Sequence, residues 1–292
     1  MTGVQTCALP IFERSGDVPK RLAREGAEVV GQRKLFQRLV PGLAHALIFW
    51  GFLVLLTTVV EVMGQVIRPA FEIPFIGGTP ALGIVQDVFG AGVLVGIAIA
   101  ASIRLFQDPE RFIGSHRLEA FRILGLIFWI VVTLFLGRGA RIALDIAPAS
   151  AWTPVSTASA ALIGWMAEPW QRASLQLLLW GHLALVLGFL VYLGYSKHLH
   201  IATSAFTVYF SSTKKRGRLT PLRIDLEGDA EPVLGAASLE DLTWKEALDL
   251  YACTECGRCQ SACPAWNTGK PLAPKLLVMD LRDHLFEQGP VV

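Results

Sequence analysis

Four cysteines near the C-terminal end form the pattern C-x2-C-x2-C-x3-C-P, from Cys253 through Cys256, Cys259 and Cys263 to Pro264. This spacing lets three thiolates reach the irons of one [4Fe–4S] cluster, and the fourth cysteine, followed by proline, ligates a second cluster. A zinc site is the nearest alternative, although zinc ligands more often come as two cysteine pairs with a long gap between them. A disulfide framework is disfavoured because the segment follows a basic stretch typical of the reducing cytoplasm. The pattern therefore predicts electron transfer.

Three histidines lie in or at the ends of apolar segments and could ligate haem iron. His182 and His200 are 18 positions apart, which on one continuous helix is five whole turns and about 27 Å, close to the thickness of the hydrocarbon core. We expect His45 at the same membrane depth as His200 but on another helix, and two imidazoles from facing helices can be the axial ligands of a b-type haem. The alternative to haem ligation is a histidine at the membrane interface with no ligand role, and we prefer this interpretation for His198. The remaining histidines, His116 and His284, are expected to be solvated or structural.

Long apolar blocks separated by short basic stretches must position these residues. The mean hydropathy is +0.49 and only 17% of the residues are charged, which is typical of membrane proteins. Four stretches are long enough to span a bilayer as helices: 39–67, 84–105, 118–136 and 175–195. The net charge of +2 gives no indication of a nucleic-acid partner, and we find no broken helix pair that would favour a transporter.

Lysine and arginine residues indicate how these spans are oriented. They are abundant before the first span, between the second and third spans, and after the fourth, and they are sparse in the other two loops. By the positive-inside rule, both ends of the chain and the cysteine motif lie in the cytoplasm, and Gly78 lies outside. Trp152, Trp165 and Trp170 suit an aromatic belt at the outer interface.

Both ends of the chain indicate a fragment of a longer protein. Residues 1–11, including Cys7, resemble a translated sequencing adapter, so we expect native sequence to begin near Phe12. At the other end, the sequence stops before the second cysteine motif that a two-cluster domain needs. We expect a capping box at Thr243 and Glu246 to open a short helix that leads to the cysteines. By residue range, we expect 1–11 to be adapter-like, 12–38 a basic cytoplasmic segment, 39–205 the membrane domain, 206–237 a linker and 238–292 a truncated cluster domain.

Two parts of the chain resemble known families. The segments Gly-Leu-Ala-His-Ala-Leu-Ile-Phe-Trp-Gly at 42–51 and Trp-Gly-His-Leu-Ala-Leu-Val-Leu-Gly-Phe at 180–189, together with Lys-His-Leu-His-Ile at 197–201, resemble the cytochrome b (gamma) subunit of membrane nitrate reductase. The tail at 252–272 resembles the cluster domain of heterodisulfide-reductase-related (Fe-S)-binding membrane oxidoreductases, one bacterial branch of which fuses both modules.

The resemblance implies a fold and a set of ligands. The gamma-subunit family has five spans with the N-terminus outside, so this chain would lack its first span. It assigns His45 and His200 to the haem on the cytoplasmic side and His182 to the outer haem. Leu55 stands where the family has its second histidine ten residues after His45, so we expect one haem b and leave the second open. Cysteine-rich catalytic repeats, which follow the cluster domain in the related oxidoreductases, are not present in this sequence.

The sequence therefore predicts an all-α membrane helix bundle with four spans, a fifth expected upstream, followed by a truncated α-helical ferredoxin-like domain. The predicted function is electron transfer in the bacterial cytoplasmic membrane. A quinone or quinol would exchange electrons with haem, and two [4Fe–4S] clusters of the full-length protein would relay them to a cytoplasmic thiol/disulfide-type site or another redox partner. The alternative function is a haem-free, lipid-embedded anchor for an iron–sulfur domain.

Overall fold

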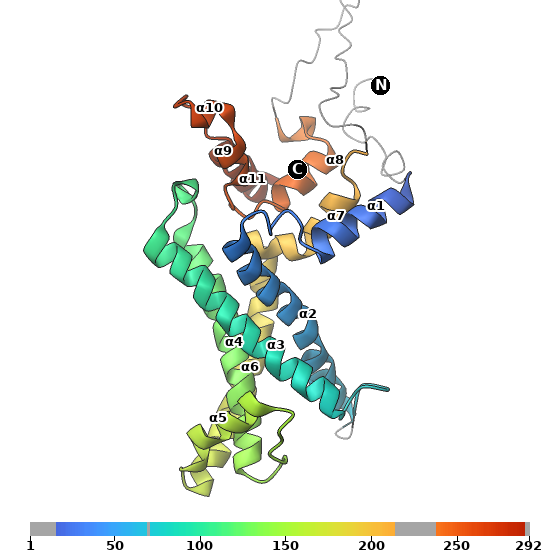
Figure 1. Cartoon of the computed structure of the whole chain (residues 1–292), viewed down its shortest axis with the longest axis vertical. Coiled ribbons are helices and arrows are strands. Elements are labelled where there is room, and N and C mark those ends of the chain that lie inside the picture. Colours follow the sequence, from blue (N-terminus) through green and yellow to red (C-terminus); the bar gives the residue numbers. More distant parts are fainter. Residues whose placement is uncertain (1–15, 69–70, 214–237, 290–292) are drawn as a thin grey trace, which may run out of the picture. The chain divides into compact units, whose positions relative to one another are not determined.

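The computed structural model describes residues 16–68, 71–213 and 238–289, and every regular element in these ranges is a helix (Figure 1). The predicted all-α architecture is confirmed. The expectations for residues 1–11, including Cys7, and for most of the linker lie outside the described residues. The described chain divides into two compact units. The first, which we call the bundle unit, comprises Lys34–Pro109 and His116–Tyr192; the second, the cluster unit, comprises the described parts of Met1–Arg33, Glu110–Ser115 and Leu193–Val292.

Within the described residues, four helices are long and apolar enough to cross a membrane, as the sequence predicts. Their bounds are Leu39–Ile67 for α2, Pro80–Ser102 for α3 with a π-helical continuation over Ile103–Gln107, Arg117–Ala143 for α4 and Glu168–Gly194 for α6. Helix α2 has the expected ends, and the other three begin four, one and seven residues earlier than expected. Each extends beyond its apolar stretch because the ends of a spanning helix lie in the polar interface, where charged side chains are tolerated.

Helix α2 packs along α3 through small residues (Figure 1). A Cβ atom added to Gly96 of α3 would lie only 2.7 Å from the carbonyl oxygen of Ala44 in α2, so the two backbones approach closely. The buried core of the bundle unit contains Val93 on α3 and Phe135 on α4, and Leu55 of α2 packs against it. Leu55 therefore fills apolar space at the position where the resembling family has a histidine.

A short helix, α5 (Pro154–Gly164), occupies the segment that the sequence analysis treated as an outer loop. Its 11 residues are too few to span a bilayer. Asp87 of α3 is 0% exposed and accepts backbone N–H bonds from Val155 at 2.6 Å and Ser156 at 3.2 Å, and the Ser156 hydroxyl donates to it as well. The carboxylate thus satisfies donors at the N-terminus of α5 that no intrahelical partner can reach.

The last span does not continue through His200, and this corrects the sequence analysis. Helix α6 ends at Gly194, a 3-10 turn covers Lys197–Leu199, and α7 (His200–Tyr209) begins at the histidine. Ser196 causes the break, because its hydroxyl accepts from the backbone N–H of His198 at 3.2 Å and caps the new turn. The argument that places His182 and His200 on one face of a continuous helix is therefore wrong.

The cluster unit is built from short helices. They are α1 (Val18–Glu25), α7, α8 (Trp244–Tyr251), α9 (Arg258–Ala262), α10 (Pro264–Asn267) and α11 (Pro274–Gln288), with single turns at Gly26–Val30, Glu110–Phe112, Lys197–Leu199 and Leu239–Asp241. The capping box expected at Thr243 is confirmed, since its hydroxyl accepts from Glu246 N–H and the Glu246 carboxylate accepts from Thr243 N–H at 2.8 Å. Tyr251 of α8 stacks edge-on against Phe286 of α11 with ring centroids 5.1 Å apart.

Candidate functional site

The four motif cysteines lie around two short helices of the cluster unit. Cys253 and Cys256 belong to the cysteine loop, which we define as residues 252–257 between α8 and α9. Cys259 is the second residue of α9, and Cys263 precedes α10, in which Pro264 is the first helical residue. None of the four forms a disulfide; Cys259 is exposed and the others are partly buried. The thiols are therefore available as ligands.

Two left-handed residues shape the cysteine loop on either side of Cys256. Glu255 has φ of 57° and Gly257 has φ of 71°. A Cβ atom at Gly257 would lie 2.5 Å from the carbonyl oxygen of Arg111, so both the backbone angle and the close approach require glycine here. Glu255 has no such freedom, and a non-glycine residue in this region persists only where its surroundings hold it.

The Glu255 side chain is held by two buried cations. Lys197 Nζ donates to its Oε2 at 3.1 Å, and Arg282 Nη2 donates to its Oε1 at 2.9 Å. The three side chains are only 2–6% exposed. Arg282 Nη1 also donates to the backbone carbonyl of Cys253 at 3.2 Å, so the guanidinium binds the cysteine loop at two points. These bonds overcome the backbone strain at Glu255 and fix the path of the loop.

Lys275 at the start of α11 places a third buried cation in this region. It is 1% exposed, and its ammonium donates to Arg111 O at 2.9 Å, Ile113 O at 2.6 Å and the Ser115 hydroxyl at 2.9 Å. All three acceptors are formally neutral. Burial lowers the pKa of Lys275 below its ordinary value. The negative charges of Glu255 and of three cysteine thiolates act in the opposite direction but do not cancel this effect.

Buried cations outnumber buried carboxylates around the cysteine loop. Lys197, Lys275 and Arg282 are buried, whereas Glu255 is the one buried acidic residue among the described residues of the cluster unit. Asp283 also pairs with Arg282, at 2.8 Å, but its side chain is 40% exposed. Charges taken out of water need compensation nearby. The surplus of buried positive charge suits an anionic group bound by cysteine thiolates, such as an iron–sulfur cluster.

The thiols themselves differ in acidity. Burial raises the pKa of Cys253, whereas a hydrogen bond from the Glu255 backbone and the charge of the Arg282 guanidinium act to lower it without cancelling the rise. Burial also acts on Cys256, but hydrogen bonding and charge from Arg258 outweigh it and lower the pKa of Cys256 below the ordinary value. The thiolate is the form that binds metal. Cys256 is therefore the more readily ionised of these two thiols.

His200 carries the hydrogen bond expected of a metal-ligating histidine. Its Nδ1 lies 2.9 Å from the carbonyl oxygen of Lys197. Because a carbonyl can only accept, this contact assigns the proton to Nδ1 and leaves the Nε2 lone pair available. Burial lowers the pKa of His200, which favours the neutral imidazole that binds iron.

His182 on α6 has an equivalent arrangement within the bundle unit. Its Nδ1 lies 2.9 Å from the hydroxyl oxygen of Thr133 on α4. The same hydroxyl can donate to the backbone carbonyl oxygen of Trp129 at 2.7 Å or to that of Ile130 at 3.0 Å. With the hydroxyl proton donated to either carbonyl, its oxygen accepts from Nδ1–H. The Nε2 of His182 is then left as the ligating atom.

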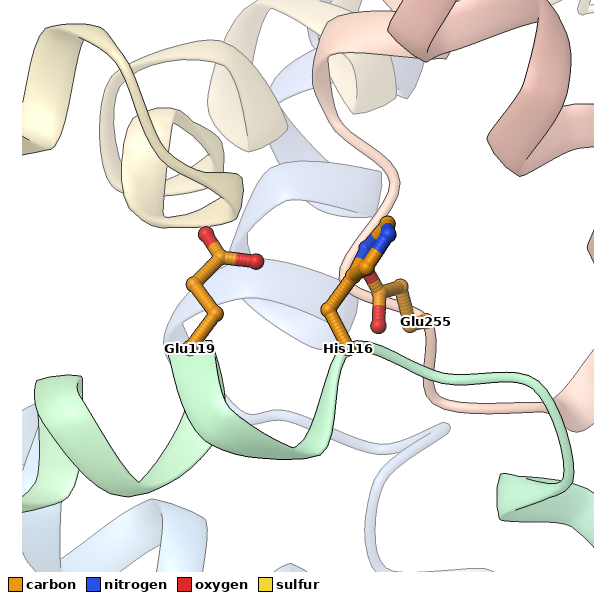
Figure 2. A group of neighbouring side chains, drawn as sticks. All are labelled: His116, Glu119 and Glu255. Atoms are coloured by element: carbon orange, nitrogen blue, oxygen red, sulfur yellow. The ribbon is translucent and has the colours of Figure 1, made fainter.

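The other histidines differ in their surroundings. His45 is half-buried in α2 and stacks on Phe49, with ring centroids 6.3 Å apart. His45 and His182 belong to the bundle unit and His200 to the cluster unit, so the pairing of His45 with His200 stays a prediction. His116 is exposed at the start of α4, one turn before Glu119 (Figure 2), and His284 is exposed on α11.

The sequence analysis missed the ionic residues that hold the cysteine loop. Glu255 stands inside the motif, between Cys253 and Cys256, and its charge was a signal that could have been used. Lys197 and Lys275 gave no comparable signal, because nothing in their local sequence distinguishes a buried lysine from a solvated one.

Comparison with known proteins agrees with this geometry. Residues 244–265 match the family model described as "4Fe-4S binding domain". The chain carries an iron–sulfur domain. The match covers α8, the cysteine loop, α9 and Pro264, and so includes all four motif cysteines.

Three curated proteins are similar to longer parts of the chain. The "Probable iron-sulfur-binding oxidoreductase FadF" of Bacillus subtilis is 29% identical over 273 residues, 94% of this chain and 38% of that protein. The "EtfAB:quinone oxidoreductase" of Syntrophomonas wolfei is 33% identical over 276 residues, 89% of this chain and 37% of that protein. The "Probable membrane-anchored ferredoxin" of Chromohalobacter salexigens is 40% identical over 109 residues, 35% of this chain and 16% of that protein.

The first two similarities cover 94% and 89% of the chain, so they include membrane helices as well as the cluster domain. The chain is thus similar to iron–sulfur-binding oxidoreductases, and it spans less than two fifths of the length of these relatives. No solved structure matches it. Together with the four membrane-length helices, the comparisons support a membrane protein with an iron–sulfur electron-transfer domain.

Proposed function

We propose that this chain is the membrane electron-transfer part of a quinone-linked oxidoreductase. Its bundle unit would exchange electrons with quinone or quinol through haem b, and its cluster unit would relay them on the cytoplasmic side. In the full-length protein they would continue to or from a heterodisulfide-reductase-like thiol/disulfide site or another redox partner. The quinone proposal is supported by the name of the Syntrophomonas relative, and the bacterial membrane location by the source of all three relatives.

The observation that carries the proposal is the hydrogen bonding of the candidate ligands. His182 and His200 each use Nδ1 for a bond to oxygen, which orients the ring and leaves Nε2 for iron. The cysteines lie in a loop surrounded by buried cations, which suits an anionic cluster. Both groups supply reversible one-electron chemistry when bound, and the residues of the chain orient them and limit the access of water.

The proposed ligand sets follow from the sequence motifs. Cys253, Cys256 and Cys259 would hold one [4Fe–4S] cluster, and Cys263 would contribute to a second. His45 and His200 would hold haem b on the cytoplasmic side. His182 would belong to a second, outer haem if a ligand outside this chain completed it, because Leu55 packs in the core and cannot ligate iron. We propose residues 39–205 as the membrane domain and 238–292 as the cluster domain.

A reduced-minus-oxidised optical spectrum of the chain purified from membranes tests the haem. We expect a sharp b-type band that reappears when a reduced quinol analogue replaces dithionite as the reductant. Iron content and the EPR spectrum, measured on the same sample, report the cluster separately.

The second candidate function is a haem-free membrane anchor for the iron–sulfur domain. Leu55 favours it, because apolar packing replaces a histidine of the resembling family, and so does the name of the Chromohalobacter relative. A sample with a full cluster signal and no haem band would establish the anchor and reject the haem relay.

A further inference from the structure

One ionic network joins the cysteine loop to the turn that carries His200, and both lie in the cluster unit. Glu255, between Cys253 and Cys256, is bonded to Lys197, and the carbonyl of Lys197 accepts from the His200 ring. Lys197 and Glu255 are 58 positions apart in the sequence. The network is thus a direct physical link between a candidate haem ligand and the cluster ligands.

The network holds the cysteine loop, but a structural role of this kind does not by itself require charged side chains. A buried ion pair seldom stabilises a fold more than apolar residues of the same volume, because both charges lose their hydration. The buried part of the network contains two cations and one carboxylate, with all three side chains 2–6% exposed, and the second carboxylate, Asp283, is 40% exposed. Such an arrangement has its largest effect on a charge that changes nearby, since interactions in a buried site are screened least.

We propose that Glu255 is a positioning residue that sets the reduction potential of the cluster held by Cys253, Cys256 and Cys259, with Lys197 and Arg282 opposing its charge. Reduction of the cluster by one electron adds one negative charge beside the Glu255 carboxylate. That carboxylate disfavours the reduced form, whereas the buried cations favour it. This inference rests on the cluster and is independent of the haem.

The geometry determines which variants are informative. In Glu255→Gln the negative charge is removed while the amide oxygen can still accept from Lys197 or Arg282, so the reduced cluster becomes easier to form. In Lys197→Gln one cation is removed and Glu255 keeps its bond to Arg282 at 2.9 Å, so the reduced cluster becomes harder to form. Arg282 is left unchanged because it also binds the Cys253 carbonyl.

Asp249→Asn provides a matched control. Asp249 lies on α8, four residues before Cys253, and pairs with Lys245. Its replacement by Asn therefore removes one carboxylate charge from the same unit. Its side chain is 49% exposed, and water and salt screen it. The cluster potential should be unchanged in this variant.

The experiment is a dithionite titration of the purified chain in which EPR follows the reduced cluster, with iron content measured in parallel. At a fixed potential, we expect the reduced-to-oxidised ratio to rise about tenfold in Glu255→Gln and to fall about tenfold in Lys197→Gln, each equal to about 59 mV for a one-electron couple. Opposite shifts at full iron content support the proposal.

The proposal is overturned if both variants shift the potential in the same direction, or if neither moves it beyond Asp249→Asn. If Glu255→Gln loses iron, the Lys197→Gln titration decides alone, because Glu255 remains paired there. A missing haem band in all variants would reject the haem relay and leave this inference standing. A missing cluster signal in the unmodified chain would reject this inference and the cluster part of the proposed function together.

Discussion

Lys197 Nζ lies 3.1 Å from Glu255 Oε2, and both side chains are almost fully buried. One residue comes from the turn after the last membrane-length helix, and the other comes from inside the cysteine motif. The pair therefore connects the turn after the last membrane-length helix to the cysteine loop without relying on the intervening linker. Removing either partner leaves a buried charge with less compensation, which makes the loop sensitive to substitutions far away in the sequence.

The first prediction concerns the cysteine ligands. Replacing Cys256 with Ala should abolish the cluster that it shares with Cys253 and Cys259, because a cubane held by two of these thiolates loses its coordination. Iron analysis and EPR of the purified chain measure this loss. Ser261→Ala, in α9 of the same unit, is the control and should retain iron. Equal iron in Cys256→Ala and the unmodified chain would contradict the ligand assignment.

The second prediction concerns the glycine that follows Cys256. Gly257→Ala should reduce cluster occupancy severalfold, because a Cβ atom would lie 2.5 Å from Arg111 O at a backbone angle that side chains rarely adopt. Gly269→Ala is a matched control, since its φ is also positive, at 73°, but no atom lies within 4 Å of the added Cβ. Iron content measures both variants. Equal losses would show that backbone strain alone, rather than the contact with Arg111, is responsible.

The iron–sulfur domain and the four membrane-length helices could be predicted from sequence because each depends on local pattern. The spacing of the cysteines indicates a cluster motif, and about twenty consecutive apolar residues indicate a membrane-spanning helix. The pairing of Lys197 with Glu255 depends on tertiary contact, and no local pattern indicates it. The break at Ser196 was missed for a different reason. The hydroxyl is a recognisable N-cap signal, but the apolar residues on both sides of it favoured one long helix.

The third prediction concerns Asp87, whose carboxylate satisfies the N-terminus of α5. Asp87→Ala should destabilise the bundle unit by about 1–3 kcal/mol for each buried donor left unsatisfied, and the thermal midpoint in detergent should fall. Asp108→Asn is the control. It removes a carboxylate from a pair with Arg117 at 3.4 Å whose side chains are more than half exposed, so the change should be below about 1 kcal/mol. Equal midpoints for Asp87→Ala and the control would refute the capping role.

The fourth prediction concerns orientation in the membrane. Reporter fusions after Gly78 and after Ser212 should fall in opposite compartments, with Gly78 outside and Ser212 in the cytoplasm. The reason is the excess of lysine and arginine before α2 and after α6. Fusions in the same compartment would rule out the four-span arrangement.

The last prediction concerns haem. His45→Ala should remove the haem b that we assign to His45 and His200, because a six-coordinate b-type haem needs both imidazoles. His182→Ala should leave this haem in place. Thr133→Val removes the hydroxyl that bonds His182 Nδ1 at 2.9 Å and nearly preserves the side-chain volume, so it should affect only a haem bound at His182. Haem is measured by the pyridine haemochrome assay and the reduced spectrum. Loss of all haem in His182→Ala, with none lost in His45→Ala, would reverse the assignment. In that case Thr133→Val should also broaden or shift the remaining band, since the orientation of the ligating ring depends on the bond that its other nitrogen makes.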